Sequence, residues 1–328
     1  MNPASDFPRH HQDLGHATHL VDIGLYRPGL AACYVVQHGD ELALLDCGTR
    51  HSAKQVLATV RALGAAPEQV RWVIPTHVHL DHASGAGQLM AACSNAQLVV
   101  HPKGLQHMVD PSKLQAGAIA VYGEAAFQRD FGDLQAIDAA RCIAAEDGQQ
   151  FGLGDAHLQF MHTPGHANHH GCILDSASGY LFTGDTFGLG YQELARPSPY
   201  LVATTSPVAF DPDAWMGSID RLLDLQPSAV CLTHFSKHAD PAALAPMLRE
   251  SIHAHTEIAL AEEANDGEGR LERLRSAVDH LLVGGAVQHC GVSEERAREL
   301  LAGDVELNAQ GLGVWLARRA KRAQQAPA

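Results

Sequence analysis

The segment Thr76–His82 constrains the fold of this chain more than any other part of its sequence, because it places four metal-competent side chains directly after a predicted strand. Residues i and i+2 of an extended backbone point the same way, so His77 and His79 are expected to bind one ion. Once the chain turns, Asp81 and His82 face a second ion. Adjacent histidines also occur in solvated turns, but four such residues at one strand end favour a metal site.

A metal site of this kind needs ligands from elsewhere in the chain. One ion takes three or four ligands and a pair of ions takes about six, so the fold must bring further donors to the same place. Three later segments end predicted strands with a suitable side chain: Thr163–His166 as Thr-Pro-Gly-His, Phe182–Asp185 as Phe-Thr-Gly-Asp, and Leu232–His234 as Leu-Thr-His. Each of His166, Asp185 and His234 is compatible with a structural role when taken singly, whereas their combination favours metal binding.

Strand and helix patterns alternate through the first 240 residues, and polar site residues collect at strand ends. Strands are predicted at 17–23, 32–37, 42–46, 71–75, 97–101, 157–162, 171–175, 180–183 and 229–233, and helices at 52–63, 84–93 and 212–225. After Asp240 only helical spacing remains, at 241–263, 269–283 and 293–301. We therefore predict an α/β domain over residues 1–240 and a helical domain over 241–328, whose basic tail from Arg318 is expected to fray.

Residues 103–147 interrupt this alternation with Gly, Ala and isolated aromatic residues, which predicts a mostly helical insertion. Its apolar residues Tyr122, Phe127, Phe131 and Leu134 have three interpretations: they pack the insertion onto its own domain, line a substrate pocket, or form a homodimer contact. Packing is favoured, because aromatic residues at helical spacing usually belong to a core.

The charge balance and the cysteines limit the class of partner and the compartment. Hydrophobic residues make up 46% and the formal net charge is −14, so the chain can bury a large core but offers no basic stripe for nucleic acid or anionic lipid. A small-molecule substrate that is neutral or partly cationic fits better. The seven cysteines are scattered singly and their odd number excludes a complete set of intrachain disulfides. With a polar stretch over Met1–Gly15 and no long apolar run, the sequence predicts a cytoplasmic protein without membrane contact.

The order of these motifs resembles that of the metallo-β-lactamase superfamily, over about residues 17–240. The family has an early Asp before Gly, a short H-x-H-x-D-H run, a His after Pro-Gly, an Asp after Gly and a last His. This chain matches all of them, with Asp46-Cys47-Gly48 as the first. The nearest resemblance is to uncharacterised hydrolase-like members, with a more distant one to glyoxalase II. It implies an αββα sandwich with the site at one edge of two sheets, followed by a C-terminal helical region.

The resemblance also implies a role for each residue of the site. His77, His79 and His166 bind the first metal, Asp81, His82 and His234 bind the second, and Asp185 bridges both. Asp46 holds the H-x-H-x-D-H loop without touching metal. His170 matches a common family histidine and is expected behind the ligands or in the pocket wall. Asp81, Asp46 and His170 are thus the side chains expected to serve catalysis, whereas the role of His169 stays open.

The expected chemistry follows from two divalent ions that share a water. They lower its pKa towards 7, so a metal-bridged hydroxide is available to attack the carbonyl of an ester, lactone or thioester. Asp81 then passes a proton to the leaving group while it stays a ligand. Zinc is the expected ion, and iron or manganese suit the same donors.

Two other functions stay open. A mononuclear-iron oxidoreductase resembling persulfide dioxygenases needs only two histidines and one aspartate, so the retained Asp81, His82 and His234 count against it. A metal-binding sensor without significant turnover is compatible with the same residues. Lactonases for quorum signals commonly place a tyrosine three residues beyond the bridging Asp, where this chain has Gly188, with Tyr191 nearby.

Overall fold

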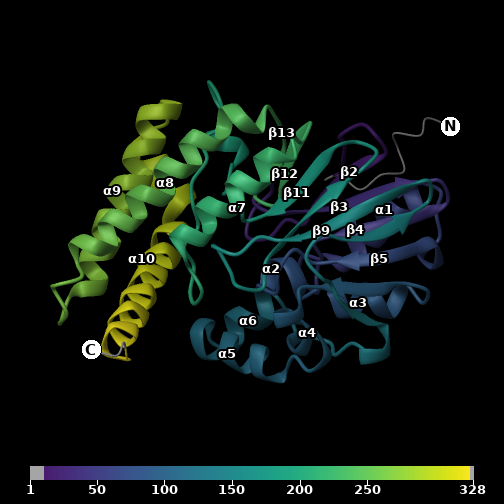
Figure 1. The fold of residues 1–328 in the computed structure, drawn as a ribbon, viewed down its shortest axis with the longest axis horizontal. Coiled ribbons are helices and arrows are strands. Elements are labelled where there is room, and N and C mark those ends of the chain that lie inside the picture. The colour runs from purple at the N-terminus through teal and green to yellow at the C-terminus, as the bar shows by residue number, and fades with distance from the viewer. Residues whose placement is uncertain (1–10, 326–328) are drawn as a thin grey trace. The chain divides into compact units, whose positions relative to one another are not determined.

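The computed structural model describes residues 11–325, and the chain forms two compact units (Figure 1). The sheet unit comprises the described residues up to His162 together with His169–Gly184 and Pro227–Ala239. The helical unit comprises Thr163–Asn168, Asp185–Gln226 and the described residues from Asp240 onward. The predicted boundary at residue 240 is therefore the last of several points at which the chain enters the helical unit.

Two β-sheets form the sheet unit. The first has seven strands in the order β1-β2-β3-β4-β5-β6-β7, antiparallel as far as β4 and parallel from there. These strands are β1 (His11–Asp13), β2 (Thr18–Asp22), β3 (Ala32–His38), β4 (Glu41–Leu45), β5 (Val70–Ile74), β6 (Gln97–Val100) and β7 (Cys142–Ala144).

The second sheet has six strands in the order β13-β12-β11-β10-β9-β8. They are β8 (Gln149–Leu153), β9 (Ala156–His162), β10 (Gly171–Asp175), β11 (Tyr180–Gly184), β12 (Ala229–Leu232) and β13 (Ser236–Ala239). β11 and β12 pair in parallel and the other neighbours pair antiparallel. The parallel pair matters for the site, because strands that run the same way end at the same edge of a sheet.

Alternation along the strands of the first sheet builds two separate cores. On β4, Leu42 and Leu44 point into one cluster, whereas Ala43 and Leu45 point into another. The second cluster also contains Phe160 of β9, so the two sheets face each other across it. Both faces of the first sheet are therefore buried, which explains why its strands read as nearly continuous apolar runs.

Helices cover the first sheet and make up the insertion. They are α1 (Ala53–Ala62), α2 (Leu80–Ala83), α3 (Ala86–Ala92), α4 (Pro102–Val109), α5 (Ser112–Tyr122) and α6 (Glu124–Asp130). The predicted helical character of residues 103–147 holds as far as Asp130, and the later part supplies strand β7. Phe127 and Phe131 are buried in the core beside the first sheet, as the packing interpretation predicts, while Tyr122 stays 40% exposed.

The helical unit consists of α7 (Pro212–Asp224), α8 (Pro241–Ala261), α9 (Arg270–Cys290), α10 (Glu294–Gln325) and the short turn η4 (Gln192–Leu194). The expected helices after residue 240 are thus confirmed. The prediction that the tail frays from Arg318 was wrong as far as Gln325, because tertiary contacts hold the last turns of α10. The Arg319 guanidinium lies 2.9 Å from a Glu263 carboxylate oxygen and 4.9 Å from the centre of the Trp315 ring.

Two expectations, about membrane helices and about disulfides, concern the described residues. Across the part of the chain that the structure describes, no helix is long and apolar enough to cross a bilayer. All seven cysteines fall in that part, and each is a free thiol. The amino-terminal residues 1–10 of the stretch expected to be polar, and residues 326–328 of the tail, lie outside the described residues.

Candidate metal centre

Asp81, His82 and His234 come together in the sheet unit. Asp81 and His82 lie on α2, just after the loop that follows β5, and His234 follows the end of β12. The Oδ2 atom of Asp81 is 3.1 Å from Nε2 of His234 and 3.5 Å from Nε2 of His82. One ligand atom from each residue lies within 4.8 Å of the others, which is a spacing that a single cation can bridge.

Hydrogen bonds fix which ring nitrogen of each histidine faces this group. Nδ1 of His234 donates to the Leu30 carbonyl oxygen at 2.7 Å, and Nδ1 of His82 donates to Oδ2 of Asp46 at 2.9 Å. Because each Nδ1 donates its hydrogen, Nε2 is the nitrogen through which each neutral ring offers a lone pair towards Asp81. Two neutral imidazoles and a carboxylate oxygen are a donor set that zinc, iron and manganese accept. The residues present therefore fit a divalent metal ion.

The Asp46 carboxylate ties two ligand-bearing segments together, Thr76–His82 and Leu232–His234. Its Oδ1 accepts hydrogen bonds from the Thr76 backbone N–H at 2.7 Å and from the Thr76 hydroxyl at 2.9 Å. Its Oδ2 accepts from His82 and from the Thr233 hydroxyl, next to His234. Asp46 is 1% exposed and has a left-handed backbone with φ of 53°, so the fold strains a residue to aim this carboxylate.

His77 and His79 form a second pair in the sheet unit, with ring centres 4.4 Å apart. Nδ1 of His77 lies 3.1 Å from the Thr76 hydroxyl oxygen. Since that hydroxyl donates its hydrogen to Asp46, its oxygen accepts from His77, which leaves Nε2 of His77 as the nitrogen available to a metal. Asp46 thus also acts on His77 through Thr76.

His170 and His169 both lie next to this pair. The His170 ring is fully buried and stacks on His77 with centres 4.7 Å apart, whereas the His169 ring lies edge-on to His79 with centres 5.6 Å apart. A Cβ added at Gly184 would lie 2.6 Å from Nε2 of His170, so only glycine fits at the end of β11. His170 therefore packs behind a candidate ligand, and both histidines surround the His77–His79 pair.

His166 and Asp185 form the corresponding pair in the helical unit. Nε2 of His166 lies 3.3 Å from Oδ2 of Asp185, and Nδ1 of His166 donates to the Thr204 carbonyl oxygen at 2.8 Å. The Pro-Gly turn before His166 needs its glycine, because a Cβ on Gly165 would lie 2.3 Å from the Cβ of Trp215. His166 therefore also presents Nε2, and it does so beside a carboxylate.

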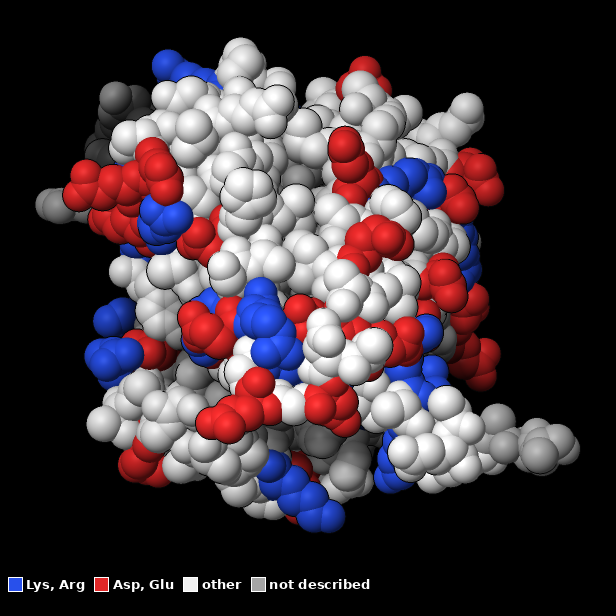
Figure 2. Space-filling model, turned by 90° about the vertical axis from the view of Figure 1, so that its left-hand side faces the viewer, with Lys and Arg blue, Asp and Glu red and all other residues white. Residues whose placement is uncertain are grey.

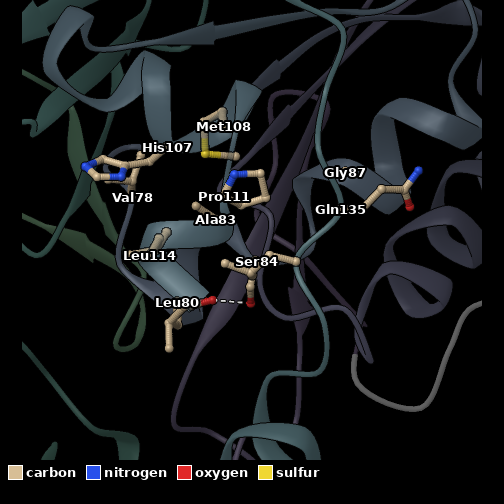
Figure 3. A pocket seen from close by; sticks show the side chains of 11 residues that line it. Val78, Leu80, Ala83, Ser84, Gly87, His107, Met108, Pro111, Leu114 and Gln135 are labelled. Carbon is tan, nitrogen blue, oxygen red and sulfur yellow. Dashed lines mark hydrogen bonds between the residues drawn. The ribbon is translucent and has the colours of Figure 1, made fainter. Parts of the chain in front are cut away.

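A small apolar pocket lies behind the H-x-H-x-D-H loop. Val78 and Leu80, the residues between the candidate ligands, line it together with Met108, Leu114 and Leu134 of the insertion (Figure 3). The cavity measures about 10 Å³, which is room for roughly one water molecule. Leu134 therefore packs the insertion against the loop, and this pocket is too small for a substrate.

Surface charge is mixed on the face shown in Figure 2, where acidic and basic side chains lie among each other. Ion pairs also join helices of the helical unit, such as Arg298 with Asp279 at 3.0 Å and Arg275 with Glu306 at 2.7 Å. Such exposed pairs neutralise basic groups locally and add little stability.

The fold and these groups define a class of protein. The family model of the metallo-beta-lactamase superfamily matches residues 26–234, so the chain belongs to this superfamily. This match confirms the predicted family and its αββα fold.

Individual relatives agree with the family assignment. A metallo-beta-lactamase fold-containing protein from Sulfurisphaera tokodaii is 27% identical over 210 residues, which are 63% of this chain and 73% of the relative. A hydroxyacylglutathione hydrolase from Acidiphilium cryptum is 27% identical over 222 residues, covering 66% of this chain and 74% of the relative. Among solved structures, the archaeal superfamily protein ST1585 from Sulfolobus tokodaii has a TM-score of 0.64 at 22% identity, covering 91% of this chain and 98% of that chain. At that identity the structural likeness shows the fold alone.

Some residues that hold the ligands carry no sequence signal. The Leu30 and Thr204 carbonyls fix His234 and His166, yet any residue type supplies a backbone carbonyl. Thr76 had a signal, because it directly precedes the metal-binding run His77–His82 and carries a hydroxyl that can contact it. Tyr191, considered from sequence as a lactonase-like tyrosine, donates its hydroxyl to Asp304 on α10 at 3.0 Å.

Proposed function

We propose that this protein is a dinuclear metal-dependent hydrolase that cleaves an ester, lactone or thioester. The observation that carries the proposal is the Asp81–His82–His234 group, in which both imidazoles present Nε2 towards one carboxylate oxygen. Two nearly buried imidazoles that face one carboxylate oxygen at these spacings form a donor set that a divalent cation can bridge. Zinc is the first choice of ion for this donor set.

In this proposal the other four predicted ligands hold a first ion, with His77, His79 and His166 as its histidines and Asp185 as the bridge to the second ion. Two observations support this assignment. The first is that the motifs occur in the order of the family. The second is that Asp185 directly follows Gly184 in the chain, and Gly184 packs against Thr76 and His170. Covalent continuity limits the Cα of Asp185 to about 3.8 Å from that of Gly184.

When bound, the ions lower the pKa of a water and polarise the substrate carbonyl. The chain's own residues supply the rest of the chemistry. The Asp81 side chain is 25% exposed, compared with 0% for His82 and 6% for His234, so it is the member of its group that a substrate reaches. We assign to Asp81 the transfer of a proton to the leaving group. Asp46 and His170 act indirectly, by orienting His82 and His77.

The mononuclear-iron alternative explains fewer of these contacts, because such an oxidoreductase has no use for a second group with two preset imidazoles. A metal-binding sensor uses the same residues and differs from the hydrolase in turnover. The relative named hydroxyacylglutathione hydrolase supports an acyl substrate. The free thiols and the net charge of −14 support a cytoplasmic protein that acts on a small molecule rather than on nucleic acid or membrane.

The test combines metal analysis with a substrate panel. Protein purified without chelator is expected to contain about two ions per chain, as the donor set requires. Lactones, acyl thioesters and phosphodiesters are then assayed after removal and return of zinc, iron or manganese, with the acyl substrates expected to turn over. One iron per chain, together with oxygen uptake on a persulfide, would establish the dioxygenase instead. Full metal content without turnover of any substrate would favour the sensor.

A further inference from the structure

Helix α10 makes an unusual set of contacts with the loop before α7. Asn308 is fully buried, and its Oδ1 accepts hydrogen bonds from the Thr205 backbone N–H at 2.6 Å and from the Thr205 hydroxyl at 2.8 Å. Its Nδ2 donates to the Asp304 carbonyl at 2.8 Å, which fixes the amide orientation. The side-chain amide of Asn308 is thus fully committed to holding this loop.

One turn further along α10, the backbone itself touches the loop. A Cβ added at Gly311 would lie 1.7 Å from the Thr205 carbonyl oxygen, a distance that no side chain tolerates. Gly313 on the same helix differs, since its Cβ would meet Leu274 at an ordinary 3.8 Å. Of these two glycines, only Gly311 brings the backbone of α10 against the loop.

The peptide that Asn308 holds is the same peptide that orients His166. The Thr204 carbonyl and the Thr205 N–H belong to one planar peptide group. His166 donates to the carbonyl at 2.8 Å and Asn308 accepts from the N–H at 2.6 Å. Because the group is rigid, any rotation of it breaks both hydrogen bonds together.

A second helix holds the nearby Val202–Ala203 peptide of the same loop. The hydroxyl of Ser251 on α8 accepts from the Ala203 backbone N–H at 2.9 Å. With α8 on one side and α10 on the other, the Thr204 carbonyl has little freedom to turn. A carbonyl held in this way keeps the hydrogen of His166 on Nδ1 and leaves Nε2 as a ligand.

We infer that Asn308, supported by the glycine at position 311, is a positioning residue for the metal ligand His166. The C-terminal helix acts through the Thr204–Thr205 peptide, about a hundred residues away in the chain and outside the family's metal motifs. The inference rests on the proposed function only in taking His166 as a ligand. Loss of a hydrogen-bond partner behind a metal ligand typically lowers metal affinity 10- to 100-fold, and we expect about that loss.

The experiment compares two pairs of variants in full-length protein. Gly311→Ala drives a methyl group against the Thr205 carbonyl, and Gly313→Ala is its matched control on the same helix. Asn308→Ala removes the acceptor, whereas Asn308→Asp retains it. Zinc affinity is measured by competition with a chromogenic chelator, and the tautomer of His166 is read by nitrogen-15 NMR of the metal-free protein. Circular dichroism monitors folding.

We expect Gly311→Ala and Asn308→Ala to bind one of the ions 10- to 100-fold more weakly, with a mixture of His166 tautomers. Gly313→Ala should bind like the parent, and Asn308→Asp, which keeps the acceptor but turns an oxygen towards the Asp304 carbonyl, should recover part of the loss. Parental affinity in Asn308→Ala overturns the inference, as does an equal loss in all variants. His166→Ala is measured in parallel: if it keeps both ions, the proposed metal centre fails, and if it alone loses an ion, only the role of Asn308 fails.

Discussion

Replacing Asp46 by asparagine tests how the fold prepares His82 for metal. The substitution keeps the shape of the side chain but turns one acceptor oxygen into an NH₂ donor. In the parent protein, Oδ1 receives two hydrogen bonds from Thr76 and Oδ2 receives those of His82 and Thr233. Asparagine must therefore direct its NH₂ at one of these two sets of donors.

The structure determines which set it faces. An NH₂ turned towards Thr76 would face the backbone N–H that lies 2.7 Å from Oδ1 in the parent protein. A backbone N–H is always a donor, and a buried donor left unpaired costs about 1–3 kcal/mol. An NH₂ turned towards His82 meets a ring that can move its hydrogen to Nε2. The Thr233 hydroxyl can rotate to accept. We expect the second orientation, because only its neighbours can adapt.

That orientation removes the lone pair of His82 that faces Asp81. Zinc affinity of the Asp81–His82–His234 group should fall by about 10- to 100-fold, which corresponds to about 1.4–2.8 kcal/mol. The free energy of unfolding of the metal-free protein should change by less than the loss expected for Asp46→Ala, which leaves all four donors unpaired. Zinc titration measures the zinc affinity, and urea unfolding measures the free energy of unfolding. Nitrogen-15 NMR of the histidine rings shows which nitrogen of His82 carries the hydrogen. If His82 stays protonated on Nδ1 in the asparagine variant and zinc binds as in the parent, the reasoning is refuted.

Other predictions concern single residues. His79→Ala should abolish activity and lower the metal content measured by elemental analysis, whereas His169→Ala should keep the metal; equal loss in both would contradict the ligand assignment. Burial lowers the pKa of His255 to about 4, partly offset by its hydrogen bond to the Ser251 carbonyl. His255 should therefore cost the metal-free protein stability as pH falls below the unfolded pKa of about 6.5, by about 2 kcal/mol at pH 5 in urea unfolding, and His255→Leu should reduce the pH dependence by that amount. Among the thiols, a brief alkylation analysed by mass spectrometry should modify Cys142 and Cys290 and spare the five that are buried, and labelling of those five in folded protein would count against the described core.

Much of the sheet unit follows from its sequence pattern, because both faces of the first sheet are buried and its strands are long apolar runs. The edge strand β13 was missed, since Ser236–Ala239 reads Ser-Lys-His-Ala and pairs on one side through its backbone. Strand β8 was missed because it begins with two glutamines and Gly152 separates its buried residues Phe151 and Leu153. Backbone pairing decides these short strands, and the side chains carry little sign of it.

The sequence also predicts only part of the candidate site. Donor side chains at strand ends are visible in sequence, and Asp46 was expected to hold the loop that its carboxylate contacts. The supports of the histidines were not visible, because the Leu30 and Thr204 carbonyls lie far away in the chain and have no side-chain signature. Asn308 was not predicted either, since a polar residue within a long helix usually faces solvent.

The segments of the helical unit are separated along the chain, so the ribosome synthesises them at different times. Its first segments, residues 163–168 and 185–226, leave the ribosome long before α10 does. Until that last helix arrives, the peptide beside His166 has no Asn308 to hold it. We expect the nascent chain to complete its sheets before α10 is synthesised and to acquire a fully oriented His166 only after that helix has folded, so that tight metal loading follows the synthesis of α10.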